Sequence, residues 1–159
     1  MTSETPVSQL WDLLEKQDIG MLTTEDRGLP RSRPMSSHID RENGLIHFLT
    51  RRTADKIEEM HHDRGIGVTY PDHASMTYIS VSGRGTASTD QALIERLWDV
   101  GAEAWFGDGK SDVAVITLDP EIAEFWNNDK TIVENVWEFG KGYFTDQSPA
   151  MGENAKVSL

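Results

Sequence analysis

The sequence predicts a mainly β protein, with an antiparallel sheet closed into a small barrel and short helices at its flanks. Three observations support this prediction. Five or six segments have the apolar content and length of strands, turn residues separate them, and the helical segments between them are short. The chain has 159 residues, enough for one domain with a hydrophobic core of its own.

The first fifty residues predict a helix followed by an antiparallel meander. Leucine and tryptophan at helical spacing favour a helix over residues 8–16. Three strands are expected after it, over 18–24, 31–39 and 45–50. The first two are separated by "EDRGLP" and the last two by "DRENG", in which Asn43-Gly44 is a strong hairpin signal.

The second half of the chain continues with the same kinds of segment. Apolar spacing predicts helices over 53–63 and 91–105. Strands are expected over 65–71, 75–88, 113–126 and 131–139, with Asp119-Pro120 interrupting the third of them. Residues 142–159 are polar and are expected to form a flexible tail, so the folded domain is predicted to be residues 1–141.

Bulk composition excludes several classes of function. A net charge of -12 argues against nucleic acid as a partner, because phosphate backbones require a basic face. A mean hydropathy of -0.50 and the lack of a long apolar run argue against a membrane span. The chain has no cysteine and no secretory signal, which favours a cytoplasmic location. No metal site is expected, because histidines and acids do not recur at ligand spacing.

Two groups of cations stand out against this acidic background. In the strand 31–39, Arg31 and Arg33 share a face, and Pro34 lacks the N–H that a central strand would need. Such a strand favours an edge position with exposed backbone, although two solvated surface arginines would give the same pattern.

The second group follows the strand 45–50. Lys56 lies in the first turn of the helix expected from residue 53, for which Thr53 is the predicted N-cap. A lysine there opposes the helix dipole, and a helix N-terminus favours an anion. Because the "DRENG" hairpin is expected to return 45–50 alongside 31–39, one anion is predicted to contact both Arg33 and Lys56.

These segments resemble the FMN-binding split barrels related to pyridoxamine 5'-phosphate oxidase, in their general stress protein branch. The resemblance covers residues 5–138. It is carried by "GLPRSRPM", "HFLTRRTADK", "YISVSGRGTASTD" and "AWFGDGKSDVAVITLDPEIAEFW", in this order and spacing. It implies a six-stranded antiparallel split β-barrel, and a homodimer with FMN in the cleft between the subunits.

The resemblance also implies a role for each matching residue. Arg33 and Lys56 would contact the FMN phosphate, with donors from Thr50 and Thr53 near it. The remaining expected flavin contacts are Pro34, Met35 and Ser36 beside the isoalloxazine ring, Leu49 on the neighbouring strand, and Trp105 from the partner chain.

One departure restricts the expected reaction. The oxidases carry a C-terminal Arg-x-His segment that grips the vitamer phosphate, and nothing in this chain matches it. The resemblance therefore implies an FMN-dependent oxidoreductase acting on a small molecule other than a B6 vitamer. The alternatives are a flavin-binding stress or carrier protein without turnover, and a protein that uses the deazaflavin F420 or FAD.

Overall fold

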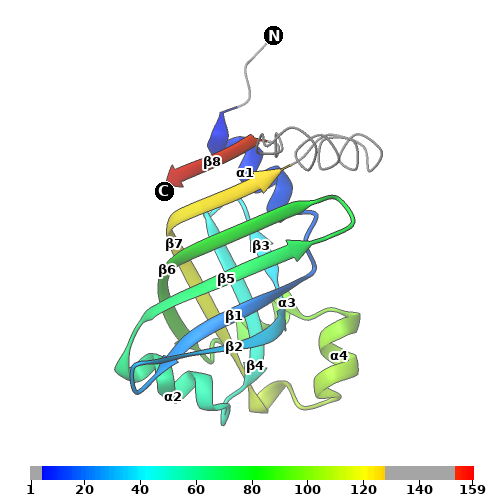
Figure 1. The fold of residues 1–159 in the computed structure, drawn as a ribbon. Helices are drawn as coiled ribbons and strands as arrows, with labels where there is room; N and C mark the ends of the chain where they lie inside the picture. Colours follow the sequence, from blue (N-terminus) through cyan, green and yellow to red (C-terminus); the bar gives the residue numbers. More distant parts are fainter. Residues whose placement is uncertain (1–4, 128–152) are drawn as a thin grey trace, which may run out of the picture.

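The fold is an antiparallel sheet that curls into a half-open barrel with short helices around it (Figure 1). A computed structural model describes residues 5–127 and 153–159. The strand order in this part of the chain is β2-β1-β5-β6-β7-β4-β3, with β8 paired to β7. The predicted mainly β class is confirmed, and the sheet of the described residues has eight strands where six are expected.

The elements have the following bounds. The strands are β1 (Ile19–Asp26), β2 (Leu29–Ser36), β3 (His38–Asp40), β4 (Leu45–Arg51), β5 (Gly65–Asp72), β6 (Thr77–Ser88), β7 (Val113–Asn127) and β8 (Glu153–Ser158). The helices are α1 (Pro6–Leu14), α2 (Asp55–His62), α3 (Gln91–Leu97) and α4 (Val100–Phe106), followed by a 3-10 turn at Lys110–Asp112. No helix in the described ranges is both long and apolar enough to cross a membrane.

The barrel is open between β2 and β3. The sequence predicts one strand over 31–39, but the chain leaves the strand at Ser37, where the backbone N–H bonds the carbonyl of Asp18. β2 pairs with β1, while only the short β3 pairs with β4. The hairpin is predicted to place 45–50 alongside the whole strand 31–39. In the structure it pairs β4 only with β3, while β2, which carries Arg31 and Arg33, approaches β4 across the opening without pairing with it.

The long strand β7 continues through Asp119-Pro120, so the predicted interruption is wrong. A register shift between Ser82 and Gly83 of β6 accommodates the proline within the paired strands. Gly83 is required at this bulge, because a Cβ there would lie 2.0 Å from the carbonyl oxygen of Asp119. β7 then pairs with β4 through its first half and with β8 through its second.

The prediction of a flexible tail is wrong for the last residues of the chain, because Glu153–Ser158 form the strand β8. β8 pairs along its whole length with β7, because its backbone groups satisfy the edge that β7 presents there. Val157 of β8 is buried in the main core. The strand expected over 131–139 and the rest of the expected tail up to residue 152 lie outside the described residues.

Two hydrophobic clusters hold the elements together. The larger one fills the barrel, and α1 closes it with leucines that are completely buried (Leu10, Leu14). The smaller cluster lies outside the barrel, where Leu49 and Val115 pack against α3 and α4. The predicted helix 91–105 is thus two helices, broken at Trp98 and restarted by Asp99, whose carboxylate caps the backbone of Ala102 at 2.7 Å.

Candidate functional site

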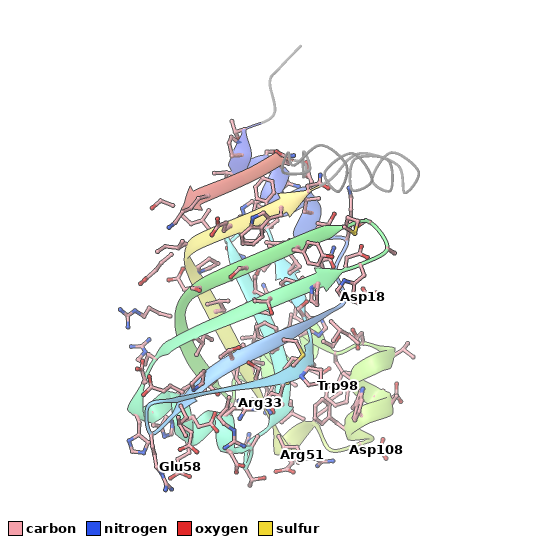
Figure 2. The ribbon with its side chains drawn as sticks, in the orientation of Figure 1. Asp18, Arg33, Arg51, Glu58, Trp98 and Asp108 are labelled. Atoms are coloured by element: carbon pink, nitrogen blue, oxygen red, sulfur yellow. The ribbon has the colours of Figure 1, made fainter. Side chains whose placement is uncertain are left out.

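A cavity of about 720 Å³ lies beside the open edge of the barrel, between β2, β4, α2 and α4. This volume is within the roughly 300–1,000 Å³ typical of small-molecule sites. Most of the residues singled out from the sequence line it: Pro34, Met35, Ser36, Leu49, Thr50, Thr53, Lys56 and Trp105. Arg33 is not part of the lining, although it lies at the same end of the sheet, opposite α1 (Figure 2).

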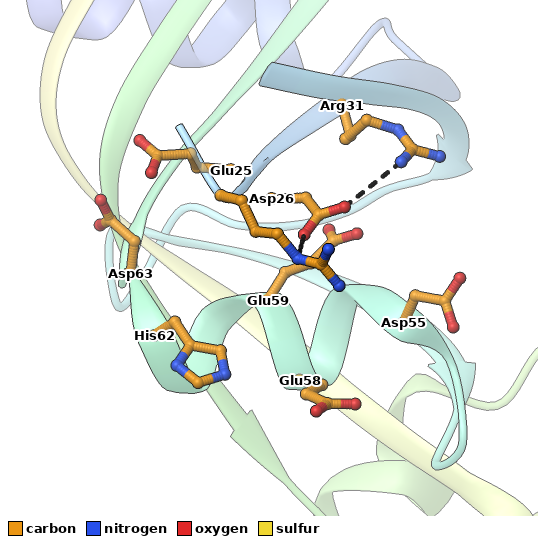
Figure 3. Close-up of a pocket in the computed structure, with 9 residues that line it drawn as sticks. Glu25, Asp26, Arg31, Asp55, Glu58, Glu59, His62 and Asp63 are labelled. Carbon is orange, nitrogen blue, oxygen red and sulfur yellow. Dashed lines mark hydrogen bonds and ion pairs between the residues drawn. The ribbon is translucent and has the colours of Figure 1, made fainter. Parts of the chain in front are cut away.

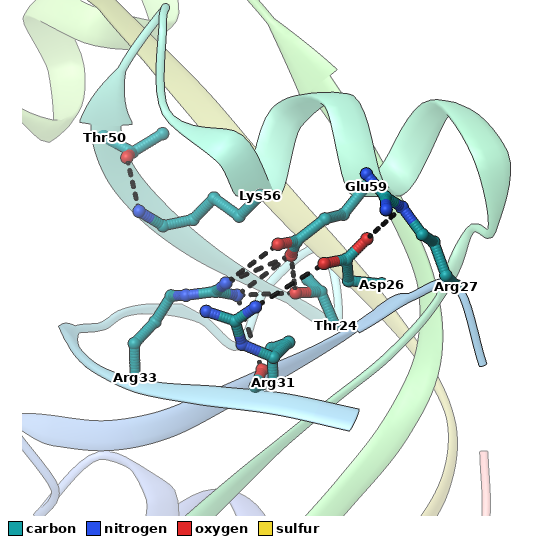
Figure 4. A network of polar contacts seen from close by, with 8 residues as sticks. All are labelled: Thr24, Asp26, Arg27, Arg31, Arg33, Thr50, Lys56 and Glu59. Carbon is teal, nitrogen blue, oxygen red and sulfur yellow. Dashed lines mark hydrogen bonds and ion pairs between the residues drawn. The ribbon is translucent and has the colours of Figure 1, made fainter. Parts of the chain in front are cut away.

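Lys56 forms the cationic end of the cavity. Its Nζ donates a hydrogen bond to Oγ1 of Thr50 at 3.0 Å (Figure 4), and no carboxylate lies within ion-pair distance among the residues that the structure describes. Burial lowers the pKa of Lys56, and the nearby charge of Arg33 lowers it further, while the charges of Glu59 and Asp55 act in the opposite direction without cancelling the shift. A bound anion would offset both effects, so this ammonium is suited to a phosphate.

The N-terminus of α2 adds backbone donors at the same end. The N-cap is Ala54 rather than the predicted Thr53, and no side chain caps the first turn. Both residues line the cavity. Because the first N–H groups of a helix have no intrahelical acceptor, this uncapped turn can receive anion oxygens beside Lys56.

Arg33 is held away from the cavity by Glu59 of α2 (Figure 4). Its two terminal nitrogens lie 3.0 and 3.1 Å from the carboxylate oxygens, and Nη1 also donates to Oγ1 of Thr24 at 2.5 Å. The sequence predicts that Arg33 and Lys56 share one anion. In the structure, the anion nearest to Arg33 is instead a side chain of the same protein.

Glu59 is ionised in this arrangement. Its residue is only 8% exposed, and this burial disfavours the charged form. The hydrogen bond from Thr24 and the pairing with Arg33 outweigh burial, so the pKa of Glu59 lies below its usual value. A carboxylate buried among these partners ties α2 to the edge of the sheet.

The other walls of the cavity provide an apolar surface and an unpaired strand edge. Met35 from β2 and Leu49 from β4 face the same space as Trp105 from α4. Trp105 is 77% exposed, so it stands at the mouth of the cavity. β2 ends the sheet and pairs only with β1 among the described strands, which leaves the backbone groups on its other side available to a planar polar ligand.

His38 and Asp99 also line the cavity, and no sequence pattern selected them as site residues. His38 Nδ1 lies 4.0 Å from a carboxylate oxygen of Asp99. Burial lowers the pKa of His38, while Asp99 acts in the opposite direction. The net lowering favours the uncharged imidazole of His38, whose ring nitrogens can donate or accept a hydrogen bond. An aspartate is a favoured N-cap residue, so Asp99 could have been identified in the sequence as the start of a helix. That helix contains Trp105, which would have placed Asp99 near the same site.

A second cavity, of about 690 Å³, lies on the other side of α2 and is mostly acidic (Figure 3). Its lining comprises Glu25, Asp26, Arg27, Arg31, Asp55, Glu58, Glu59, His62 and Asp63. No group of three potential metal ligands in the described part of the chain is arranged to hold an ion. Its negative charge makes this cavity unsuitable for a phosphate.

The family of the chain follows from comparison with known proteins. Residues 5–150 match the family model described as "Pyridoxamine 5'-phosphate oxidase like". The chain belongs to this family, which confirms the resemblance inferred from its motifs.

Individual relatives lie in the general stress protein branch. General stress protein 26 of Bacillus subtilis (strain 168) is 26% identical, over 80% of this chain and 92% of its own. The crystal structure of a protein from Jannaschia sp. CCS1, assigned to general stress protein 26, is 28% identical with a TM-score of 0.74, covering 95% and 96% of the two chains. A Xanthomonas citri structure described as a general stress FMN/FAD binding protein is 27% identical, with a TM-score of 0.68 and coverage of 78% and 89%.

The pairing of Arg33 with Glu59 predicts a pH-dependent loss of stability in Arg33→Met. At pH 7 this variant leaves a buried carboxylate without its cation, and we expect the free energy of unfolding to fall by about 2–3 kcal/mol. In the wild type, Glu59 has a lower pKa in the folded state than in the unfolded chain. Its contribution to the free energy of unfolding is therefore fully present above the pKa of the unfolded chain, and it is lost as the pH falls through the pKa of the folded state. In the variant, burial raises the pKa of Glu59, so the difference between the two proteins should shrink from pH 7 towards pH 4.

Urea unfolding at several pH values measures this difference. Arg31→Met is the matched control, because Arg31 lies on the same strand face in an exposed pair with Asp26, and it should change stability by less than about 0.5 kcal/mol. A pH-independent loss in Arg33→Met would contradict the ionised state of Glu59.

Proposed function

We propose that this protein binds FMN in the cavity between β2, β4, α2 and α4 and acts as a flavin-dependent oxidoreductase on a small molecule. The single observation that carries the proposal is the cationic end of this cavity, where Lys56, Thr50 and the uncapped first turn of α2 converge. The Lys56 ammonium is partly buried and donates a hydrogen bond to a hydroxyl, with Glu59 and Asp55 acting on it only through their charges. A terminal phosphate would give it a direct anionic partner.

The apolar end of the cavity suits an isoalloxazine ring. Met35, Leu49 and Trp105 offer apolar contact area, and the free edge of β2 offers backbone donors and acceptors in a row. A flavin ring is flat and has a polar edge, so it can use both surfaces at once. The Xanthomonas citri relative described as an FMN/FAD binding protein supports the same ligand class.

The redox chemistry would be that of the flavin, which accepts and donates a hydride when bound. The described residues supply binding, orientation and partial exclusion of water. His38, paired with Asp99 in the cavity wall, is the side chain placed to hold or release a proton beside a substrate. Without the C-terminal Arg-x-His segment, the proposed substrate is not a B6 vitamer.

A homodimer is part of the proposal, because the mouth of the cavity is unusually apolar for a solvent-facing surface. Ile19 and Trp105 line it and are 63% and 77% exposed, and Val100 of α4 is 84% exposed. Large apolar side chains gathered at one opening favour a protein contact there. A second copy of the chain would cover them and complete the flavin site.

The phosphate contact predicts selective loss of FMN affinity in Lys56→Gln. We expect the Kd for FMN to rise about tenfold or more, because one charge-assisted contact is lost. The Kd for riboflavin, which lacks the phosphate, should change less than twofold. Flavin fluorescence quenching measures both values.

Lys110→Gln is the matched control for this experiment. Its ammonium pairs with Glu95 outside the cavity, so neither flavin should bind differently. Wild-type protein that does not bind FMN at micromolar concentration would contradict the proposed function.

Turnover and cofactor identity need separate measurements. A mass spectrum of the ligand extracted from purified protein distinguishes FMN from FAD and from the deazaflavin F420. Rapid reduction of the bound flavin by a nicotinamide cofactor supports an oxidoreductase, whereas very slow reduction favours a flavin carrier.

The proposed dimer predicts a solution mass about twice the chain mass of 17.9 kDa. Ile19→Asp should shift the protein to monomer, because it places a charge in the covered apolar mouth. Val7→Asp on α1, also partly exposed, is the control and should stay dimeric. Sedimentation velocity over a range of concentrations checks this, and a monomeric wild type contradicts it.

A further inference from the structure

Glu59 binds Arg33, a cation that lies beside the cavity without lining it. Three contacts of 3.0–3.1 Å join the terminal nitrogens of Arg33 to its carboxylate. The Arg33 side chain is 22% exposed and that of Glu59 is 8% exposed, so water screens this pair only in part. The pair is therefore a strong competitor for any other anion that approaches Arg33.

The pair lies directly beside the cavity. Pro34, which follows Arg33 in β2, lines the cavity, and so does Lys56, which precedes Glu59 by three residues in α2. Arg33 is close enough to Lys56 for its charge to lower the pKa of Lys56. An anion held by Lys56 would thus lie within reach of the electric fields of both Arg33 and Glu59.

The two terminal nitrogens of Arg33, which form the end of its guanidinium group, are occupied by the protein itself. Its terminal nitrogens already bond Glu59, and Nη1 also bonds Thr24. A phosphate at the remaining Nε–H would meet a positive charge that Glu59 already neutralises. To take the contact at the two terminal nitrogens, the phosphate must displace Glu59. That carboxylate would then remain buried, next to the added negative charge and to the acidic cavity behind α2 (Figure 3).

We propose that Glu59 is a built-in competitor for Arg33 that lowers the affinity of the cavity for the phosphate group of a flavin mononucleotide. This inference rests on the proposed function and goes beyond it, because it assigns Glu59 a regulatory role in cofactor binding. Lys56 and the N-terminus of α2 bind the phosphate. The Arg33–Glu59 pair keeps the affinity for this phosphate low enough for the bound flavin to exchange.

The experiment compares FMN and riboflavin binding to wild-type protein and to Glu59→Gln. The substituted glutamine keeps the shape of the side chain and can still hydrogen-bond, but it frees the charge of Arg33. We expect the Kd for FMN to fall about tenfold while the Kd for riboflavin changes less than twofold. In the double variant Arg33→Met/Glu59→Gln the gain in FMN affinity should disappear, because it acts through Arg33.

Each other outcome overturns the inference. Weaker FMN binding in Glu59→Gln would mean that Glu59 positions Arg33 for the phosphate instead of competing for it. Equal shifts for FMN and riboflavin would mean that the substitution acts through the shape of the cavity. If Glu59→Gln does not fold, Glu59→Asp retracts the carboxylate by one methylene, and FMN binding that is no tighter than in the wild type overturns the inference.

Failure of the proposed function looks different from failure of this inference. A wild-type protein that binds neither flavin contradicts the proposed function itself. A wild-type protein that binds FMN, with an unchanged ratio of FMN to riboflavin affinity in Glu59→Gln, contradicts only the role of Glu59.

Discussion

The ion pair between Arg33 and Glu59 is the interaction that determines the arrangement of the site. It joins β2, the last strand on one side of the open sheet, to α2, a short helix that packs on the main core through Met60 and, in part, Ile57. α2 has only Met60 as a buried apolar residue, so the polar contacts of Glu59 with Thr24 and Arg33 fix its position to a large degree. Because Lys56 and the uncapped N-terminus lie on the same helix, this pair also places the proposed phosphate donors.

An acidic protein can still bind an anion when its cations are gathered and partly buried. The net charge of -12 is distributed over the surface and is screened within about 10 Å at ordinary ionic strength. The acidic side chains near α2 collect in the second cavity, behind the helix, whereas Lys56 faces the first. The helix thus separates an acidic surface from the cationic end of the first cavity.

Much of the fold and most of the site could be predicted from the sequence, because both depend on local patterns. Alternating apolar residues and the turns at Gly28 and Asn43-Gly44 give β1 and β4 nearly the bounds expected of them, whereas the strand expected over 31–39 is divided into β2 and β3. The resemblance to the family implied nine flavin-contacting residues, of which eight line one cavity. The errors have a common cause, because each prediction was made from local propensity alone. Strand pairing keeps β7 continuous through Asp119-Pro120 and orders the C-terminal strand. Packing against the sheet accompanies the division of the predicted helix at Trp98.

The amino-acid sequence alone identified a mainly β protein of this family. It also placed Arg33 in an edge strand and Lys56 at the start of a helix. The pairing of those cations with acids depends instead on how the sheet curls. Glu59 lies 26 residues from Arg33 and has no distinguishing context in the sequence, since an acid on a short helix is usually solvated. The curl of the sheet brings α2 under β2 and buries that carboxylate, and a buried carboxylate must find a cation. Three-dimensional proximity, which no local pattern records, therefore directs Arg33 towards Glu59.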